Sequence, residues 1–149
     1  MANVKLGEFE VTLNGDLPNI GSQLPDFLLA DGELSNVDLS HFKGKRLVLN
    51  IFPSMNTPVC SAAAVRFNSL ASSLDNTVIL CISRDLAFGH KQFCINHDIN
   101  DVVFLSDMRN ENFANDYGVL HTNGKFQGLL ARSVIATDSF PKPVTPADE

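Results

Sequence analysis

The segment from Pro53 to Cys60, Pro-Ser-Met-Asn-Thr-Pro-Val-Cys, places a thiol where a helix is expected to begin. Thr57 is a favourable N-cap residue, and Pro58 suits the first helical position because its missing N–H is not needed there. Cys60 then lies in the first helical turn. Free backbone N–H groups and the positive end of the helix dipole stabilise an anion at this place, so the position favours the thiolate, the nucleophilic form of cysteine.

A helix terminus alone stabilises a thiolate only modestly, so a nearby cation is needed as well. The spacing of the residues does not identify that cation. The location of Cys60 is nevertheless typical of a functional site. Cys60 follows a strand expected to end at Phe52, and open α/β sheets place their sites at the carboxyl ends of strands. The alternative interpretation is that Thr57 and Pro58 cap an ordinary helix and that Cys60 only fills space in the core.

The chain has two further cysteines, Cys81 and Cys94. Three cysteines do not build the disulfide framework of a small secreted domain. Cys81 lies in the middle of an apolar strand pattern and is expected to be structural. Cys94 lies near the end of the following helix, and helices on one face of a sheet can bring it close to Cys60. A sulfenic acid formed on one of these thiols can condense with the other to give a disulfide.

The hydrophobic pattern alternates between strands and helices, which predicts an α/β fold with helices on both faces of a sheet. Near-continuous apolar runs are typical of buried strands, and a spacing of three to four is typical of helices. Strands are expected at 27–30, 47–52, 77–82, 102–105 and 132–136, helices at 57–74, 86–97 and 112–117, and a hairpin over 4–13.

The chain of 149 residues is expected to form one domain over 1–149, and its formal net charge is −6. An acidic chain lacks the clustered positive charge that nucleic acids and anionic membranes require. It has no apolar run long enough to span a membrane and no apolar signal region in its first ten residues, so we expect a cytoplasmic protein. Residues 138–149 hold three prolines and no period, which predicts an extended or disordered tail.

The Pro53–Cys60 segment resembles the Pro-x-x-x-Thr-x-x-Cys signature of peroxiredoxins. Its surroundings are similar to one branch of them, the bacterial thiol peroxidases, which are atypical two-cysteine peroxiredoxins. The similarity runs from about Gly21 to Ile135, and the stretches that carry it are 48–54, 75–83, 93–94, 117–119 and 128–132.

The resemblance implies a thioredoxin-like α/β fold with an N-terminal β-hairpin and a central mixed sheet flanked by helices. It implies a peroxidase in which Cys60 attacks the hydroperoxide and Cys94 is the resolving cysteine. Thr57 would hydrogen-bond the thiolate and the substrate, Pro53 would shield the sulfur from water, and the Arg132 guanidinium would supply the missing cation. Members of the family use no metal or organic cofactor, are recycled by thioredoxin and commonly form homodimers.

Formation of a disulfide requires the two Cα atoms to lie within about 7 Å. If Cys60 and Cys94 lie farther apart in the reduced protein, the first helical turn, Thr57–Cys60, must unwind before they can join.

Two features keep other functions open. Family members usually continue past the Arg132 strand into another strand and a long C-terminal helix. This sequence breaks the pattern after Ala136, so we expect that helix to be missing. The uncovered sheet face would suit a non-catalytic interaction module or an inactive truncated relative.

A metal site is the other alternative. His90, Cys94 and His97 share one helical face at spacings that a metal site could use.

Overall fold

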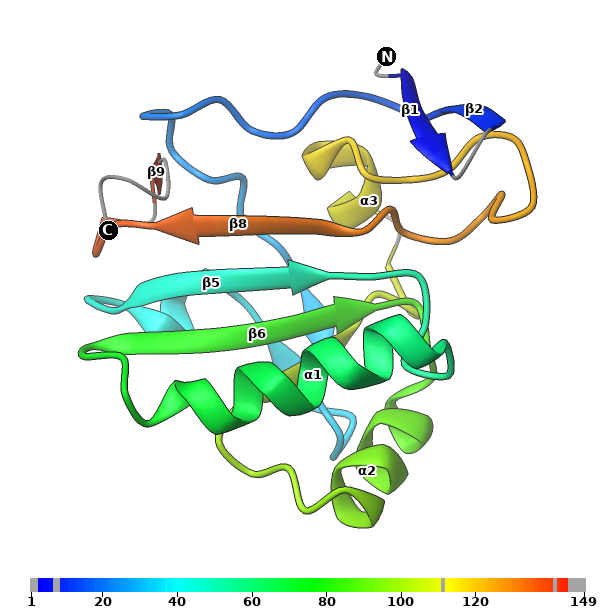
Figure 1. Cartoon of the computed structure of the whole chain (residues 1–149). Coiled ribbons are helices and arrows are strands. Elements are labelled where there is room, and N and C mark those ends of the chain that lie inside the picture. The colour runs from blue at the N-terminus through cyan, green and yellow to red at the C-terminus, as the bar shows by residue number, and fades with distance from the viewer. Residues whose placement is uncertain (1–2, 7–8, 111, 141, 145–149) are drawn as a thin grey trace.

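The computed structural model describes residues 3–6, 9–110, 112–140 and 142–144. A small N-terminal hairpin precedes a sheet with helices on both of its faces (Figure 1). The elements, in chain order, are β1 (Asn3–Leu6), β2 (Phe9–Thr12), β3 (Leu29–Ala30), β4 (Asn36–Val37), the 3-10 helix η1 (Leu39–Phe42), β5 (Arg46–Ile51), α1 (Pro58–Ala71), β6 (Thr77–Ser83), α2 (Ala87–Asn96), β7 (Val103–Ser106), α3 (Asn112–Tyr117), β8 (Ser133–Thr137) and β9 (Pro143–Val144).

The main sheet is mixed, with the strand order β4-β3-β7-β6-β5-β8-β9. The central strands β5, β6 and β7 are parallel, whereas β3 and β8 pair antiparallel with them. The helices α1 and α2 connect the parallel strands, as crossover helices do. The predicted mixed α/β sheet is therefore confirmed, and the predicted helix starts and ends agree with the structure to within three residues.

Two apolar cores lie on opposite faces of this sheet, because side chains alternate along each buried strand. On β6, Leu80 and Ile82 belong to the core that α3 covers, while Ile79 and Cys81 face the core beneath α1 and α2. Cys60 belongs to the second core. Figure 1 shows α1 running alongside β6.

The C-terminal part of the chain departs from the predicted tail. Pro143 and Val144 are extended, but they form β9, which pairs with β8 through the contacts Ala136↔Val144 and Thr137↔Pro143. A two-residue strand has no measurable period, so the sequence pattern did not predict this pairing. Residues 141 and 145–149, also part of the predicted tail, lie outside the described residues.

Within the described residues no helix follows β8. Val134 on β8 is 56% exposed, which agrees with the expectation that part of the sheet is uncovered. None of the described helices combines the length and the apolar character that crossing a membrane requires.

Candidate active site

The start of α1 has the predicted cap. Thr57 is the N-cap residue with an extended backbone, and Pro58 is the first helical residue. The Cys60 N–H donates to Thr57 Oγ1 at 3.3 Å, so the cap hydroxyl and the thiol belong to one hydrogen-bonded turn. The side chain of Cys60 is fully buried, with 0% exposure.

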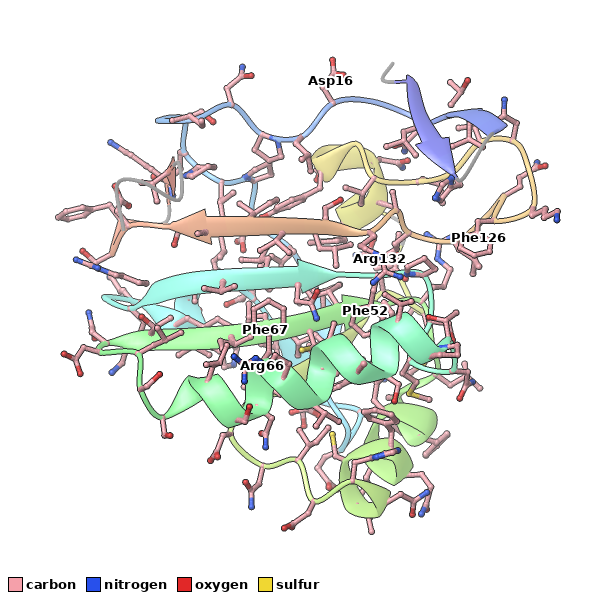
Figure 2. The ribbon with its side chains drawn as sticks, in the orientation of Figure 1. Asp16, Phe52, Arg66, Phe67, Phe126 and Arg132 are labelled. Carbon is pink, nitrogen blue, oxygen red and sulfur yellow. The ribbon has the colours of Figure 1, made fainter. Side chains whose placement is uncertain are left out.

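Arg132 supplies a cation at this thiol. Its Nη2 lies 3.2 Å from Cys60 Sγ and donates to it. The contact follows from the sheet: β8 runs antiparallel to β5 with Ser133 opposite Ile51, which brings the residue before β8 to the carboxyl end of β5. Figure 2 shows Arg132 near Phe52 at that end. A guanidinium is permanently charged, so this contact favours a thiolate over a neutral thiol.

Pro53 and Thr57 lie in the loop between β5 and α1. Pro53 is buried and directly follows the buried Phe52. The Thr57 hydroxyl donates to the Ser54 carbonyl oxygen at 3.1 Å, and the Thr57 N–H donates to the same oxygen at 3.2 Å. In this arrangement the Thr57 hydroxyl proton faces the backbone, so a hydrogen bond from it to the sulfur or to a peroxide requires the hydroxyl to rotate.

A groove with a volume of about 470 Å³ runs between the start of α1 and α2. Thr57 and Ser61 line its α1 side, and Phe93 and His97 line its α2 side. Cys60 is covered, so the groove brings solvent close to the reactive turn without exposing the sulfur.

All three cysteines are free thiols. Cys94 on α2 is half-buried and packs against the core that contains Cys60 and Cys81. Burial raises the pKa of the Cys94 thiol. Cys81 is fully buried, accepts a weak hydrogen bond from Asn50 Nδ2 at 3.7 Å, and has its pKa raised by burial to about 12. Cys81 therefore has the structural environment that the sequence predicts for it.

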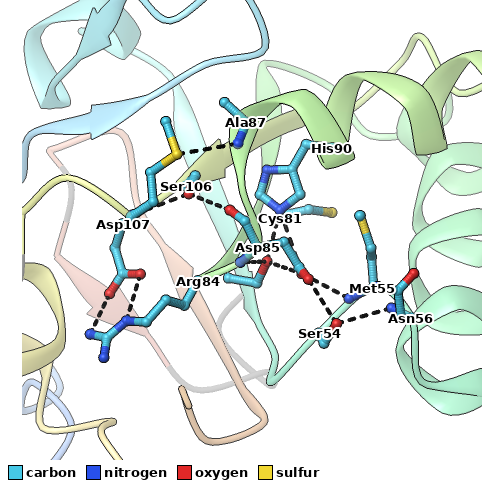
Figure 3. A network of polar contacts seen from close by, with 12 residues as sticks. Ser54, Met55, Asn56, Cys81, Arg84, Asp85, Ala87, His90, Ser106 and Asp107 are labelled. Atoms are coloured by element: carbon cyan, nitrogen blue, oxygen red, sulfur yellow. Dashed lines mark hydrogen bonds and ion pairs between the residues drawn. The ribbon is translucent and has the colours of Figure 1, made fainter. Parts of the chain in front are cut away.

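A polar network that sequence reasoning missed borders the Pro53–Cys60 loop (Figure 3). Asp85, just after β6, accepts a hydrogen bond from Ser54 Oγ at 2.7 Å and from the Met55 N–H at 2.9 Å. Ser83 Oγ donates to the same carboxylate at 2.6 Å and lies 2.7 Å from His90 Nε2. The signal that could have revealed it is the polar Ser83-Arg84-Asp85 run at the carboxyl end of a buried strand, beside the end of β5.

These contacts stabilise the Asp85 carboxylate. Burial raises its pKa, but His90, Ser83, the Met55 N–H and Ser54 outweigh burial and lower the pKa to about 2. An unfolded aspartate titrates near 3.9. Because the pKa is lower in the folded protein, the network stabilises the fold above pH 4, and this contribution disappears as the pH falls through about 2.

We therefore predict that Asp85→Asn lowers the free energy of unfolding by about 2 kcal/mol at pH 7, and that the difference from the parent shrinks between pH 4 and pH 2. Urea unfolding at pH 7, 4 and 2.5 measures this difference. A difference that stays constant over this range would contradict the assigned role of the carboxylate.

The metal-site alternative finds no support in the geometry. His90 Nε2 is bonded to Ser83, and the His97 ring lies on Phe93 with centroids 4.3 Å apart. In the part of the chain that the structure describes, no three His, Cys, Asp or Glu side chains are grouped so that they could hold a metal ion.

Comparisons with known proteins show the family of the chain. A sequence model of the Redoxin family matches residues 19–141. A thiol peroxidase from Corynebacterium glutamicum is 42% identical over 138 residues, which are 93% of this chain and 83% of that protein. A thiol peroxidase from Vibrio cholerae is 38% identical over 130 residues, 87% of this chain and 79% of that protein. The crystal structure of a peroxiredoxin-like protein from Aquifex aeolicus superposes with a TM-score of 0.89 at 30% identity, covering 96% of this chain and 83% of the other.

The thioredoxin-like fold and the matching family model place the protein among the redoxins. Within them, the chain belongs to the thiol peroxidases, a branch of the peroxiredoxins. It is thus an oxidoreductase of the peroxidase class, which reduces peroxides with a cysteine thiol.

Proposed function

We propose that the protein reduces hydrogen peroxide and organic hydroperoxides through Cys60, resolves the oxidised sulfur with Cys94, and is recycled by thioredoxin. The observation that carries the proposal is the Arg132 guanidinium at 3.2 Å from the Cys60 sulfur, at the start of a helix. A cation beside a buried sulfur, at the positive end of a helix dipole, favours the ionised, nucleophilic form of that sulfur.

In the first step the Cys60 thiolate attacks one oxygen of the hydroperoxide. The S–O bond forms while the O–O bond breaks, so the sulfur is oxidised to a sulfenic acid and the peroxide is reduced. The second oxygen leaves as alkoxide or hydroxide and takes up a proton, giving an alcohol or water. Arg132 and the positive end of the α1 dipole can stabilise the negative charge that develops on both oxygens. The Thr57 hydroxyl, after rotation, can donate to the substrate, and Pro53 limits the access of water.

In the second step the Cys94 thiolate attacks the Cys60 sulfur. The S–S bond forms, the S–O bond breaks, and hydroxide leaves and is protonated to water. A reduced thioredoxin dithiol then exchanges with this disulfide, which restores both thiols and oxidises thioredoxin. Because Cys60 is fully buried at the start of α1, we expect its turn to unwind so that the two sulfurs can meet. The homodimer and the cytoplasmic location that the resemblance implies stay predictions.

The pKa of Cys94 predicts how the second step depends on pH. Burial raises this pKa, so the thiol form dominates at neutral pH and the thiolate fraction grows about tenfold for each pH unit. We expect the rate of disulfide formation after a peroxide pulse to rise steeply between pH 7 and 9. Quenched-flow mass spectrometry measures this rate, and Cys94→Ser protein, which cannot form this disulfide, is the control. A rate that does not change with pH would contradict the prediction.

A coupled assay tests the proposed function. The protein is mixed with thioredoxin, thioredoxin reductase and NADPH, and NADPH oxidation is followed after addition of hydrogen peroxide or cumene hydroperoxide. Turnover with either substrate supports the proposal. Absence of turnover, together with thiols that persist after peroxide treatment, would instead support the non-catalytic module, for which the exposed Val134 face of the sheet is the favouring observation.

A further inference from the structure

We propose that Asp85 is a positioning residue for the Cys60 turn: its carboxylate holds the loop before α1 in the attacking geometry and has to release that loop when the disulfide forms. This inference rests on the proposed role of Cys60 as the attacking thiolate. The sequence resemblance assigns no role to Asp85, and the polar network of Figure 3 reveals one.

A path of hydrogen bonds, linked through the covalent structure of Ser54, joins Asp85 to Cys60. One carboxylate oxygen of Asp85 accepts from Ser54 Oγ and the other from the Met55 N–H, which holds the Ser54 side chain and the Met55 backbone. The Ser54 carbonyl oxygen accepts from both the N–H and the hydroxyl of Thr57. Thr57 Oγ1 in turn accepts from the Cys60 N–H. The position of the Asp85 carboxylate is therefore transmitted to the turn that carries the thiol.

Asp85 is itself anchored to the sheet rather than to a loop. Ser83, the last residue of β6, donates its hydroxyl to the Asp85 carboxylate, and Ser106, the last residue of β7, donates its hydroxyl to the Asp85 carbonyl oxygen. Since the single Ser83 hydroxyl proton is directed at Asp85, His90 Nε2 must donate to that hydroxyl oxygen. Ser83, His90 and Ser106 are all buried, so the carboxylate occupies a rigid site.

The location of the network gives it a part in both chemical steps. Asp85 lies just before α2, the helix that carries Cys94, and binds the loop just before α1, the helix that carries Cys60. These hydrogen bonds keep the α1 start in place while Cys60 attacks. The same bonds resist the unwinding that the resolving step needs. Loss of the carboxylate should therefore slow the first step and leave the second step unchanged or faster.

Asp85→Asn tests the inference by quenched-flow mass spectrometry, which separates sulfenic acid formation from disulfide formation. We expect the rate constant for attack on hydrogen peroxide to fall about tenfold or more, since small misplacements of a reacting group have effects of this size. The rate constant for disulfide formation should stay the same or rise. Asp101→Asn, the same change at an exposed aspartate, is the matched control and should alter neither step.

Ser54→Ala provides a second variant, which removes the first hydrogen bond of the path together with the bond that Ser54 Oγ accepts from the Asn56 N–H. It should slow the attack step as well, and the double variant should be no slower than Asp85→Asn alone, because Ser54 acts through Asp85. If Asp85→Asn fails to fold, the Ser54→Ala result decides the inference. An unchanged attack rate, or equal slowing of both steps, would overturn it and reduce Asp85 to a stabilising residue.

Amide hydrogen exchange separates failure of this inference from failure of the proposed function. In Asp85→Asn protein the Met55 and Cys60 amides should exchange faster than in the parent, whether or not the protein turns over peroxide. Faster exchange in a protein without peroxidase activity would support the positioning role and refute the function. Unchanged amide exchange in an Asp85→Asn protein that still reduces peroxide would refute the positioning role and support the proposed function.

Discussion

Replacing Cys60 by serine is expected to abolish peroxide reduction. A serine hydroxyl at this position is not ionised and is a far weaker nucleophile toward the O–O bond, so the rate constant should fall on the order of 10⁴-fold or more. Stopped-flow or quenched-flow consumption of hydrogen peroxide under single-turnover conditions measures the loss. Because the two side chains are nearly the same size, the fold should persist, and thermal unfolding verifies this.

Cys81→Ser is the matched control for this result. Cys81 lies in the same core on the same face of the sheet, but the raised pKa of its buried thiol keeps it neutral. The variant should keep its reaction with peroxide, although the buried hydroxyl can lower its stability. A Cys60→Ser protein that still reduces peroxide, or a Cys81→Ser protein that does not, would place the reactive sulfur elsewhere.

Arg132→Gln is expected to give the second-largest effect. The guanidinium is the cation at the Cys60 sulfur. Glutamine keeps an N–H donor on a shorter side chain but removes the charge. Removal of one donor from a site of this kind costs about 10²–10³-fold in rate, so the second-order rate constant with hydrogen peroxide should fall by that factor. The same substitution at Arg66, an exposed arginine farther along α1, is the control (Figure 2).

Arg132→Lys refines this result. Lysine restores the charge but not the planar fork of donors, so it should recover only part of the lost activity. Full activity in Arg132→Gln would contradict the view that this contact activates the thiol. An equal loss in Arg66→Gln would show that net charge, rather than the 3.2 Å contact, governs the rate.

The local part of the site could be predicted from the sequence. Thr57, Pro58 and Cys60 lie within four positions, and capping preferences act over that range, so the residues alone predict the helix start. The long elements could be predicted for the same reason, because α1 and β6 each contain enough residues to show a hydrophobic period. The two-residue strands β4 and β9 are too short to show a hydrophobic period, so the sequence pattern did not predict them.

The long-range part of the site could not be predicted from spacing. Arg132 reaches Cys60 across 72 positions, through the antiparallel pairing of β8 with β5, and only the resemblance to peroxiredoxins pointed to it. The Asp85 network joins the ends of two strands, β6 and β7, with the loop after β5. A hydrophobic pattern carries no information about which strand ends become neighbours, so neither the residues nor the resemblance revealed this network.

The central claim, that Cys60 is the sulfur which attacks the peroxide, is tested most directly by trapping its product. Cys94→Ser protein is treated with one equivalent of hydrogen peroxide in the presence of a cyclic 1,3-diketone, which labels sulfenic acids, and the labelled peptide is identified by mass spectrometry. Without the resolving thiol the sulfenic acid should persist, and we predict that the label is found on Cys60. A label on Cys81, or peroxide consumption with no label on Cys60, would contradict the account.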